Sequence, residues 1–358
     1  MDGGITKKAP VTSSQVAEHA GVSQSAVSRT FTPGASISPK TRSKVLAAAK
    51  ELGYRPNAIA RSLITNRSRI IAVVMAYLEN LFYPDVLEEL GRRLASENYH
   101  MLLFTGFMDR DSDPVFDQLM QYRVDGIILA STSLSSELSE ECMVAGIPVV
   151  LFNRTTERDS VSSVTTRNRE GGRLLGEFLV AGGHQRFGYI AGLENSSTNR
   201  DRLAGYREAL ERHGITELAI RTGNFSRREA EIAARDMLSL PDRPDAIFVA
   251  NDHMAVAVMD VARYEFGLRI PEDLSIVGYD DVGPARWPSY GITSVTQPIE
   301  NMVEATVDIL MEQIASGEIE AQHKVLPGEL IVRSSARLPA HGVVDTDGRR
   351  TWSLDPAS

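Results

Sequence analysis

The pattern of apolar and polar positions divides the chain into a short helical segment and a longer segment of alternating strands and helices. In residues 11–55, apolar side chains recur every three or four positions, which is typical of amphipathic helices. From residue 69 onward, apolar runs such as RIIAVVM, HMLLFT, GIILA and IPVVLF alternate with helical stretches. Strands that alternate with helices indicate parallel sheets. The sequence therefore predicts an all-α N-terminal domain followed by a larger α/β domain.

The run VTSSQVAEHAGVSQSAVSRT has the spacing of a helix-turn-helix. Thr12 or Ser13 can cap a first helix, and Gly21 permits a tight turn of positive φ. Ser23 can cap a second helix, with Val27 in its buried face. The outer face of that second helix carries side chains suited to the edges of DNA bases. The candidates for contact with DNA there are Ser23, Gln24, Ser25, Ser28 and Arg29.

A third helix is predicted in the run SPKTRSKVLAAAKELG, with Ser38 as its cap and Pro39 at its first position. Gly53 ends it. Its expected core residues are Val45, Leu46, Ala49 and Leu52.

The α/β segment contains two series of strands and helices, which predicts two lobes with a cleft between them at the strand ends. The short runs ITSVTQP and HKVLPGELIVRSS are expected to be late strands that cross back between the lobes. The predicted bounds are 69–165 and 296–324 for the first lobe, and 166–295 and 325–337 for the second.

The two ends of the chain lack these patterns. Residues 1–10 are expected to form a disordered arm. In residues 338–358, Pro339, Gly342, Gly348 and Pro356 interrupt any helix, and no apolar residue recurs at heptad spacing. We therefore expect a flexible tail that forms no coiled coil.

Composition excludes several classes of protein. Of 358 residues, 42% are hydrophobic and 24% are charged, as in ordinary globular proteins. No apolar run is long enough to cross a bilayer, and the start, MDGGITKKAPVTSS, lacks the apolar core of a secretory signal. The single cysteine, Cys142, excludes an internal disulfide and a Cys-based metal cluster. These features predict a cytoplasmic protein without a membrane partner.

Charge is distributed unevenly along the chain. Residues 1–68 hold ten Lys and Arg but only three Asp and Glu, a net charge of +7, whereas the remainder has a net charge of −16. A basic domain joined to an acidic body indicates that the N-terminal domain alone has a polyanionic partner. A solvated basic face without a partner would give the same charge, so the choice depends on the helix-turn-helix.

No catalytic constellation accompanies these patterns. The seven histidines are scattered, and the chain has no phosphate-binding Walker loop, nucleophile elbow or HExxH motif. We expect no enzyme activity, no metal and no cofactor. Two other functions compete with DNA binding, namely solute binding for uptake and sugar metabolism. The start of the chain lacks a secretory signal, which argues against solute binding for uptake. The absence of an acid, base and nucleophile arrangement argues against a sugar-metabolising enzyme.

Three segments resemble, in order and spacing, the headpiece of LacI/GalR-family regulators: VTSSQVAEHAGVSQSAVSRTF, TRSKVLAAAKELGYRPN and AIARSL. In that family the third segment is a hinge helix that folds on the operator and pushes a leucine into the minor groove. The resemblance implies a headpiece at 11–55 and a hinge at 56–68. It makes Leu63 the wedge, with Asn57, Ile59 and Ala60 as its neighbours in the groove.

The body is similar to the same family in HQRFGYIAGL, RLAGY and FVANDHMAVAVMDVARYEFGLRIPEDLSIVGYDD. The resemblance implies a two-lobed, periplasmic-binding-protein-like domain with parallel sheets. It also implies a homodimeric regulator, expected to be a repressor, that binds operator DNA under the control of a sugar, sugar acid or sugar phosphate. Induction and co-repression both stay open. The implied effector-binding residues are Phe82, Tyr83, Asn153, Arg202, Phe225, Asn251 and Asp280.

The chain departs from the family before the Glu-Gly-Gly of the second lobe. Family members often have Asp-Asn there, whereas this chain has Thr166-Arg167-Asn168-Arg169. If Arg167 or Arg154 faces the cleft, the effector is expected to be anionic. The alternative is that these arginines are solvated at the rim. The dimer is expected to form through the body, with the helices at 83–97 and 254–266 as its faces.

Overall fold

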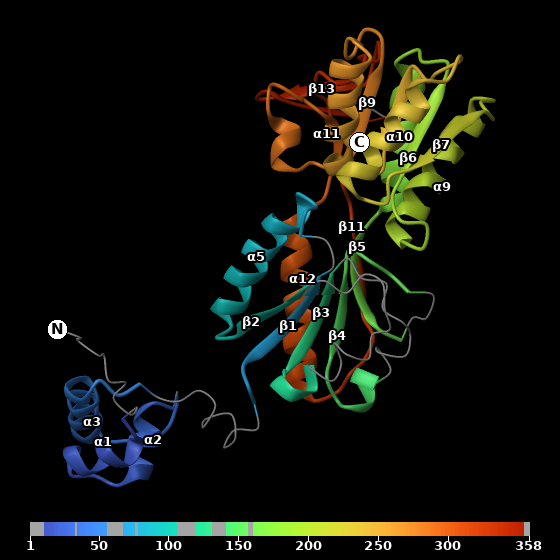
Figure 1. The fold of residues 1–358 in the computed structure, drawn as a ribbon. Helices are drawn as coiled ribbons and strands as arrows, with labels where there is room; N and C mark the ends of the chain where they lie inside the picture. Colours follow the sequence, from blue (N-terminus) through green and yellow to red (C-terminus); the bar gives the residue numbers. More distant parts are fainter. Residues whose placement is uncertain are drawn as a thin grey trace, which may run out of the picture. The chain divides into compact units, whose positions relative to one another are not determined.

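The computed structural model describes residues 11–32, 34–55, 67–75, 78–105, 119–130, 141–156 and 160–353. The chain divides into two compact units, Met1–Ser68 and Arg69–Ser358 (Figure 1). The expected arm at 1–10 and the hinge residues Asn57, Ile59, Ala60 and Leu63 lie outside the described residues. In the described ranges, no helix combines the length and apolar character that crossing a membrane requires.

The N-terminal unit is the predicted three-helix domain, formed by α1 (Ser13–Ala20), α2 (Gln24–Thr30) and α3 (Pro39–Leu52). Each helix begins at a predicted cap, because the side chains of Thr12, Ser23 and Ser38 accept hydrogen bonds from backbone N–H groups of the first turn. Gly21 and Gly53 end α1 and α3 in the left-handed conformation.

The core of this unit consists of Val16, Ala17, Val27, Val45, Ala48 and Ala49. The prediction that Leu46 belongs to it was wrong, because the side chain of Leu46 is 46% exposed. Residues 45, 48 and 49 share one face of α3, whereas a residue one position after Val45 is rotated by about 100° around the helix. Ala48 therefore takes the core position.

The first lobe of the second unit is built on a six-stranded parallel sheet in the order β11-β5-β4-β3-β1-β2. This is the fold class that the alternating pattern predicts. Its strands are β1 (Ile70–Met75), β2 (His100–Thr105), β3 (Gly126–Ala130), β4 (Val149–Phe152), β5 (Ser162–Thr166) and β11 (His323–Leu326).

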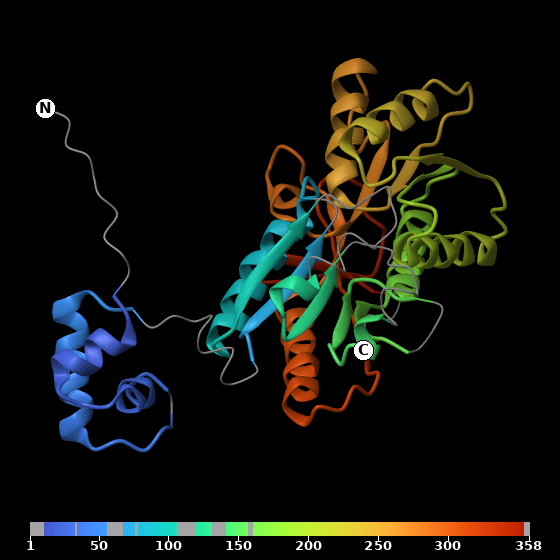
Figure 2. The same ribbon diagram turned by 60° about the horizontal axis from the view of Figure 1, so that its bottom comes forward.

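Two helices, α5 (Phe82–Ser96) and α12 (Ile299–Ser316), lie side by side against this sheet (Figures 1 and 2). Ile71, Val73 and Met75 of β1 share a core with these helices, and the alternate residues Ala72 and Val74 belong to a second core on the other face. That second core includes Cys142, and burial raises the pKa of its thiol to about 12, as expected for a structural cysteine.

The second lobe contains an eight-stranded sheet in the order β13-β14-β12-β10-β9-β8-β6-β7. Strands β10, β9, β8, β6 and β7 run parallel, and the strands beyond β10 pair antiparallel. Its strands are β6 (Phe187–Ala191), β7 (Leu218–Thr222), β8 (Ala246–Val249), β9 (Ser275–Asp280), β10 (Thr293–Thr296), β12 (Leu330–Ile331), β13 (Val343–Thr346) and β14 (Arg349–Trp352).

Helices cover both faces of this sheet. They are α8 (Asn168–Ala181), α9 (Ser197–Arg212), α10 (Arg227–Leu238) and α11 (Asp252–Asp260), the last followed by a π-helical turn at Val261–Glu265. In β6, Tyr189 contacts Tyr206 of α9, whereas a Cβ on the neighbouring Gly188 would meet Met237 of α10. Because successive side chains of a strand point to opposite faces, α9 and α10 cover different faces.

The late strands cross between the lobes as predicted. β10 and β12 belong to the second-lobe sheet, and β11 belongs to the first. β11 ends at Leu326, beyond the expected bound at residue 324.

The expected flexible tail is corrected by the structure for residues 338–353. β13 and β14 form a hairpin that extends the second-lobe sheet beyond β12 (Figure 1). The Trp352 ring packs edge-on against Phe178 of α8, and its Nε1–H donates to the His341 carbonyl. Pro339 and Gly342 do exclude a helix here, but they are compatible with an edge hairpin, and burial of the indole fixes it in place.

Helices α8 and α9 pack at very close range through glycines. A Cβ at Gly172 would lie 2.1 Å from the Arg202 carbonyl oxygen, and one at Gly205 would lie 1.8 Å from the Arg169 carbonyl oxygen. Gly172 of the EGG motif and Gly205 of the RLAG motif are therefore required by the close contact of α8 with α9. This contact positions the start of α9.

Replacement of Gly205 by alanine is expected to lower the free energy of unfolding by about 1–3 kcal/mol, because the backbones of α8 and α9 must separate. Urea unfolding followed by tryptophan fluorescence measures the loss. Gly91 of α5 is the matched control, since its added Cβ would meet one atom at 4.0 Å. Gly91→Ala is expected to be neutral or stabilising by up to about 1 kcal/mol. Equal losses in both variants would contradict the close approach.

Candidate functional site

The proposed DNA-reading residues lie on the surface of the N-terminal unit. Ser23, Gln24, Ser25, Ser28 and Arg29 are all exposed. The Gln24 amide donates to the Ser13 hydroxyl at 3.0 Å, and the Arg29 guanidinium donates to the Ser25 carbonyl and hydroxyl at 3.3 and 3.4 Å. These are long bonds at an exposed surface, so bases of a bound duplex can replace them.

The proposed effector residues of the second unit gather at the carboxyl ends of the parallel strands. Asn153 follows β4, Asn251 follows β8, and Asp280 ends β9. Phe225 lies in the turn between β7 and α10. Asn153, Phe225 and Asp280 have positive φ angles of 57°, 57° and 107°. Backbone strain of this kind in residues other than glycine is concentrated at binding sites.

Arg202 is the centre of a buried polar network in the second lobe, where it is 2% exposed. Its Nε donates to Asn168 Oδ1 at 2.8 Å, Nη1 donates to the Ala250 carbonyl at 2.6 Å, and Nη2 lies 3.2 Å from Asp280 Oδ1. The guanidinium carbon also lies 3.6 Å from the centre of the Tyr279 ring. The protein itself therefore orients and neutralises Arg202.

The carboxyl of Asp280 is held from two sides. Its Oδ1 accepts hydrogen bonds from Arg202 and from Gln297 Nε2, the latter at 2.7 Å. Burial raises the pKa of Asp280, whereas Arg202 and Gln297 act in the opposite direction. An ionised Asp280 is thus matched by donors, as a buried carboxylate requires.

A second carboxyl fixes the turn after β9. Asp252 is fully buried, accepts from the Ser294 hydroxyl and accepts the Val282 N–H at 3.1 Å. Burial, reinforced by the negative charges of Asp280 and Asp281, raises the pKa of Asp252 well above its usual value. The hydrogen bonds from the Ser294 hydroxyl and the Val282 N–H act on this pKa in the opposite direction.

The two lobes meet at Arg154, which follows β4 in the first lobe. Its Nη1 donates to the Asn153 carbonyl at 2.7 Å and to Thr198 Oγ1 of α9 at 3.0 Å. The next N–H, of Thr155, donates to the Ser197 hydroxyl at 3.0 Å. The guanidinium carbon lies 5.7 Å from the centre of the Phe225 ring. Groups of both lobes therefore share one polar site.

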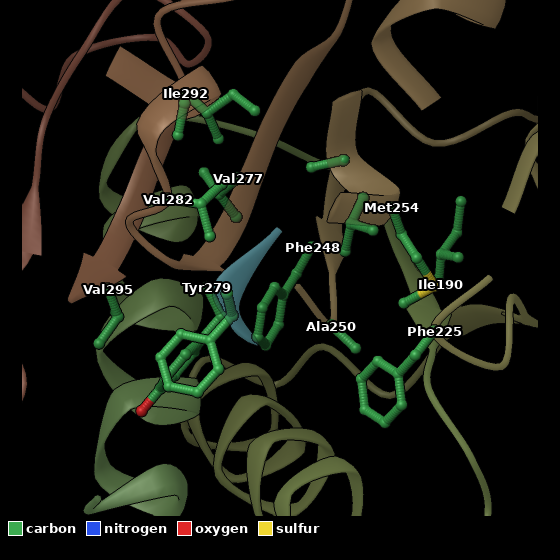
Figure 3. Close-up of a cluster of buried hydrophobic side chains, with 14 of the residues drawn as sticks. Ile190, Phe225, Phe248, Ala250, Met254, Val277, Tyr279, Val282, Ile292 and Val295 are labelled. Atoms are coloured by element: carbon green, nitrogen blue, oxygen red, sulfur yellow. The ribbon is translucent and has the colours of Figure 1, made fainter. Parts of the chain in front are cut away.

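The position of Phe225 is explained by Gly192 at the end of β6. A Cβ at Gly192 would lie 2.1 Å from the Phe225 ring, so only glycine leaves room for it. Figure 3 shows Phe225 and Ala250 among the buried apolar side chains of the second lobe. The ring thus presents a fixed apolar surface next to Arg154.

The structure distinguishes Arg154 from Arg167, for each of which the sequence allowed a position facing the cleft or one solvated at the rim. Arg167 has a side chain that is 54% exposed and lies 3.4 Å from Glu170, so it is solvated at the surface. Arg154 is 7% exposed and lies between the lobes. Of the two, only Arg154 lies at the contact between the lobes.

Phe82 and Tyr83 occupy the first turn of α5, and each is 1% exposed. Phe82 stacks on Phe152, with ring centres 6.4 Å apart, and its edge contacts Tyr83. Packing in the first-lobe core accounts for both rings, and an additional role toward a ligand stays a prediction.

Several residues of this site were absent from the sequence-based candidates. Asn168, Gln297 and Thr198 hold Arg202, Asp280 and Arg154, respectively. The first two follow strand ends directly, so the rule that ligands bind at the carboxyl ends of parallel strands would have found them. Two buried polar atoms near these strand ends, Asn153 Oδ1 and Asn251 Nδ2, have no hydrogen-bond partner. Among the residues that the structure describes, no cluster of His, Cys, Asp and Glu is placed to bind a metal ion.

Two family models match the chain. The model described as "Bacterial regulatory proteins, lacI family" matches residues 14–57, which contain α2, α3 and all of α1 except its first residue. The model of a periplasmic binding protein-like domain matches residues 177–336, most of the second lobe together with the strands that cross back. Together they cover the headpiece and a large part of the body.

Individual proteins are similar over nearly the whole chain. The chain is 32% identical to the HTH-type transcriptional repressor PurR of Vibrio atlanticus (strain LGP32) over 327 residues, which cover 90% of this chain and 97% of that protein. A solved complex of the transcriptional regulator CelR with cellobiose has 33% identity and a TM-score of 0.70, covering 91% of this chain and 100% of that chain. The lac repressor dimer bound to operator and the anti-inducer ONPF has 30% identity and a TM-score of 0.81, covering 91% and 99%.

Proposed function

The chain belongs to the LacI family of bacterial regulatory proteins, and from this membership we propose that it is a repressor whose affinity for an operator is set by a small molecule bound between its lobes. It is a transcriptional regulator and not an enzyme. The observation that carries the proposal is the joining of an exposed, basic helix-turn-helix to a two-lobed body with a shared polar site.

The headpiece supports DNA recognition by its charge and its surface. Residues 1–68 have a net charge of +7, which favours binding to phosphates regardless of sequence. Gln24 and Arg29 on α2 offer side chains that suit adenine and guanine edges in the major groove. We propose that α2 reads the operator and that the hinge segment, with Leu63 as its wedge, binds the adjacent minor groove.

The body supports binding of a carbohydrate-like effector. Asp280, Asn251 and Arg202 provide acceptors and donors for hydroxyl groups, and Phe225 provides an aromatic face. The solved CelR complex contains cellobiose, which is consistent with a sugar ligand. Because the polar site joins Arg154 of one lobe to α9 of the other, a bound ligand would change how the lobes meet. Such coupling to the operator must act in both directions.

We propose that the active form is a homodimer in the cytoplasm, with one headpiece for each half of a near-palindromic operator. The similar lac repressor is a dimer on its operator. The body offers exposed apolar side chains for such an interface, with Leu103 on β2 in the first lobe and Ile232, Tyr264 and Trp287 in the second. Helix α5 stays a predicted centre of the interface. The predicted face at 254–266 is corrected in part, because α11 is buried within the second lobe from Asp252 to Met259 and an exposed apolar side chain follows only at Tyr264.

Replacement of Arg29 by alanine tests the role of α2. We expect a loss of about 1–3 kcal/mol in operator binding, confined to one base position, because a bidentate contact to a base would be lost. The matched control is Lys44→Ala on α3, also exposed, which should weaken binding to all duplexes equally. Affinities for the operator and for its single-base variants measure the difference. An Arg29 variant that loses affinity for every sequence alike would contradict base reading by this residue.

A further inference from the structure

Arg154 is a buried cation that forms no ion pair with any acid of the described residues. It is 7% exposed, yet in the described part of the chain no carboxylate lies within 4 Å of its guanidinium, and both of its hydrogen bonds go to neutral oxygens. Arg202, at similar depth, is paired with Asp280. Buried charges in proteins are normally paired, because an isolated charge loses its hydration. Arg154 therefore differs from Arg202 in forming no ion pair with a described acid, and its charge acts on Asp280 only from a longer distance.

The nearest second-lobe element is the start of α9, which is also suited to an anion. Ser196, Ser197 and Thr198 bring three buried hydroxyls to this point. The side chain of Ser196, at the N-cap, makes no capping hydrogen bond and contacts Thr198 Oγ1 instead. The first N–H groups of this 16-residue helix thus lack a side-chain cap, and the helix dipole places partial positive charge beside Arg154.

The other described acids near this site have hydrogen-bond or ion-pair partners of their own. Asp280 is engaged by Arg202 and Gln297, and Asp252 accepts from the Ser294 hydroxyl and the Val282 N–H rather than from Arg154. Asp281 is paired with Arg333 at 2.7 Å. Asn251, which is 1% exposed, also has an Nδ2 donor without a partner. Asn153 Oδ1 is likewise an acceptor without a partner, so the two amides leave one group of each kind, and the unmatched group among the described residues is the charge of Arg154.

We propose that the effector carries an anionic group, a carboxylate or a phosphate, which binds Arg154 together with the hydroxyls of Ser197 and Thr198 at the start of α9. This inference rests on the proposed function and narrows its ligand class from carbohydrates in general to sugar acids and sugar phosphates. Because Arg154 belongs to the first lobe and α9 to the second, the anion is shared by both lobes. Its binding stabilises their contact.

Thermal unfolding of the full chain in different anions tests this inference. Both tryptophans, Trp287 and Trp352, lie in the second unit, so their fluorescence reports unfolding of the body and not of the basic headpiece. At constant ionic strength, replacing chloride by inorganic phosphate or by acetate should raise the melting temperature of the wild type in a saturable way, since ligand binding stabilises the folded state. The anion with the larger rise identifies phosphate or carboxylate as the preferred group.

Arg154→Gln removes the charge but keeps donors for Thr198 and the Asn153 carbonyl. Its melting temperature should no longer respond to either anion, whereas Arg167→Gln, the matched surface control, should respond as the wild type does. An unchanged melting temperature of the wild type in both anions, or an equal rise in Arg154→Gln, would overturn the inference. Release of operator DNA by a neutral sugar alone would also overturn it, and would leave the proposed regulatory function intact.

Discussion

Removal of residues 1–68 is expected to abolish specific operator binding and to leave a folded body. The two units have separate hydrophobic cores, so the body does not depend on the headpiece for its packing. The body alone has a net charge of −16 and should repel DNA. We expect the affinity for the operator to fall by about 10³-fold or more, which is the usual gap between specific and non-specific binding. Titration of labelled operator DNA measures this loss.

The salt dependence of binding provides the control for this truncation. Binding of the full chain should weaken steeply as salt rises, because Lys and Arg of the headpiece release counterions from DNA. Circular dichroism and tryptophan fluorescence should show that the truncated body is still folded. A folded body that binds the operator as tightly as the full chain would contradict the assignment of DNA reading to α2.

Replacement of Arg202 by methionine is expected to have the largest effect among the single substitutions proposed for the body. The change leaves Asp280 as a buried carboxylate without its cation and removes the donors to Asn168 and the Ala250 carbonyl. Loss of one partner of a buried pair costs about 3–5 kcal/mol in the free energy of unfolding. Urea unfolding measured by tryptophan fluorescence gives this value. If Arg202→Met stays folded, it should also lose its response to effector.

The double variant Arg202→Met with Asp280→Asn separates the effect of the buried ion pair on stability from the role of these side chains in the response to effector. Because it removes the buried charge as well, it should recover a large part of the lost stability but not the response to effector. The exposed Arg167→Gln should change stability by no more than about 0.5 kcal/mol. If Arg202→Met were as stable as Arg167→Gln, the buried network would not support the structure in the way its geometry indicates.

Local signals were sufficient for the headpiece. The caps Thr12, Ser23 and Ser38 and the turn at Gly21 act within a few residues, so the sequence alone predicts where the helices begin and end. The period of strands and helices likewise predicts the parallel strands of both sheets. The wrong prediction for Leu46 concerns which face of α3 is buried. Ala48 is smaller than Leu46 but lies on the buried face.

Features that depend on contacts distant in sequence were not predictable. Nothing in the run DTDGRRTW shows that Trp352 will find Phe178, which is why the hairpin at the end of the chain was expected to be a flexible tail. The sequence does not show which of Arg154 and Arg167 is buried. Only the structure distinguishes them, because Arg167 pairs with Glu170 and Arg154 is buried against α9. The partners of Arg202 also come from three separate segments of the chain.

Selection from random double-stranded DNA by the full-length chain is the most direct test of operator recognition. We expect one sequence to be enriched, with two half-sites that mirror each other as the two-fold symmetry of a dimer requires. Its enrichment should disappear when the chain lacks residues 1–68. Recovery of no common sequence from the library, or of the same sequence with the truncated body, would contradict the conclusion that this protein is a sequence-specific regulator that reads DNA through its headpiece.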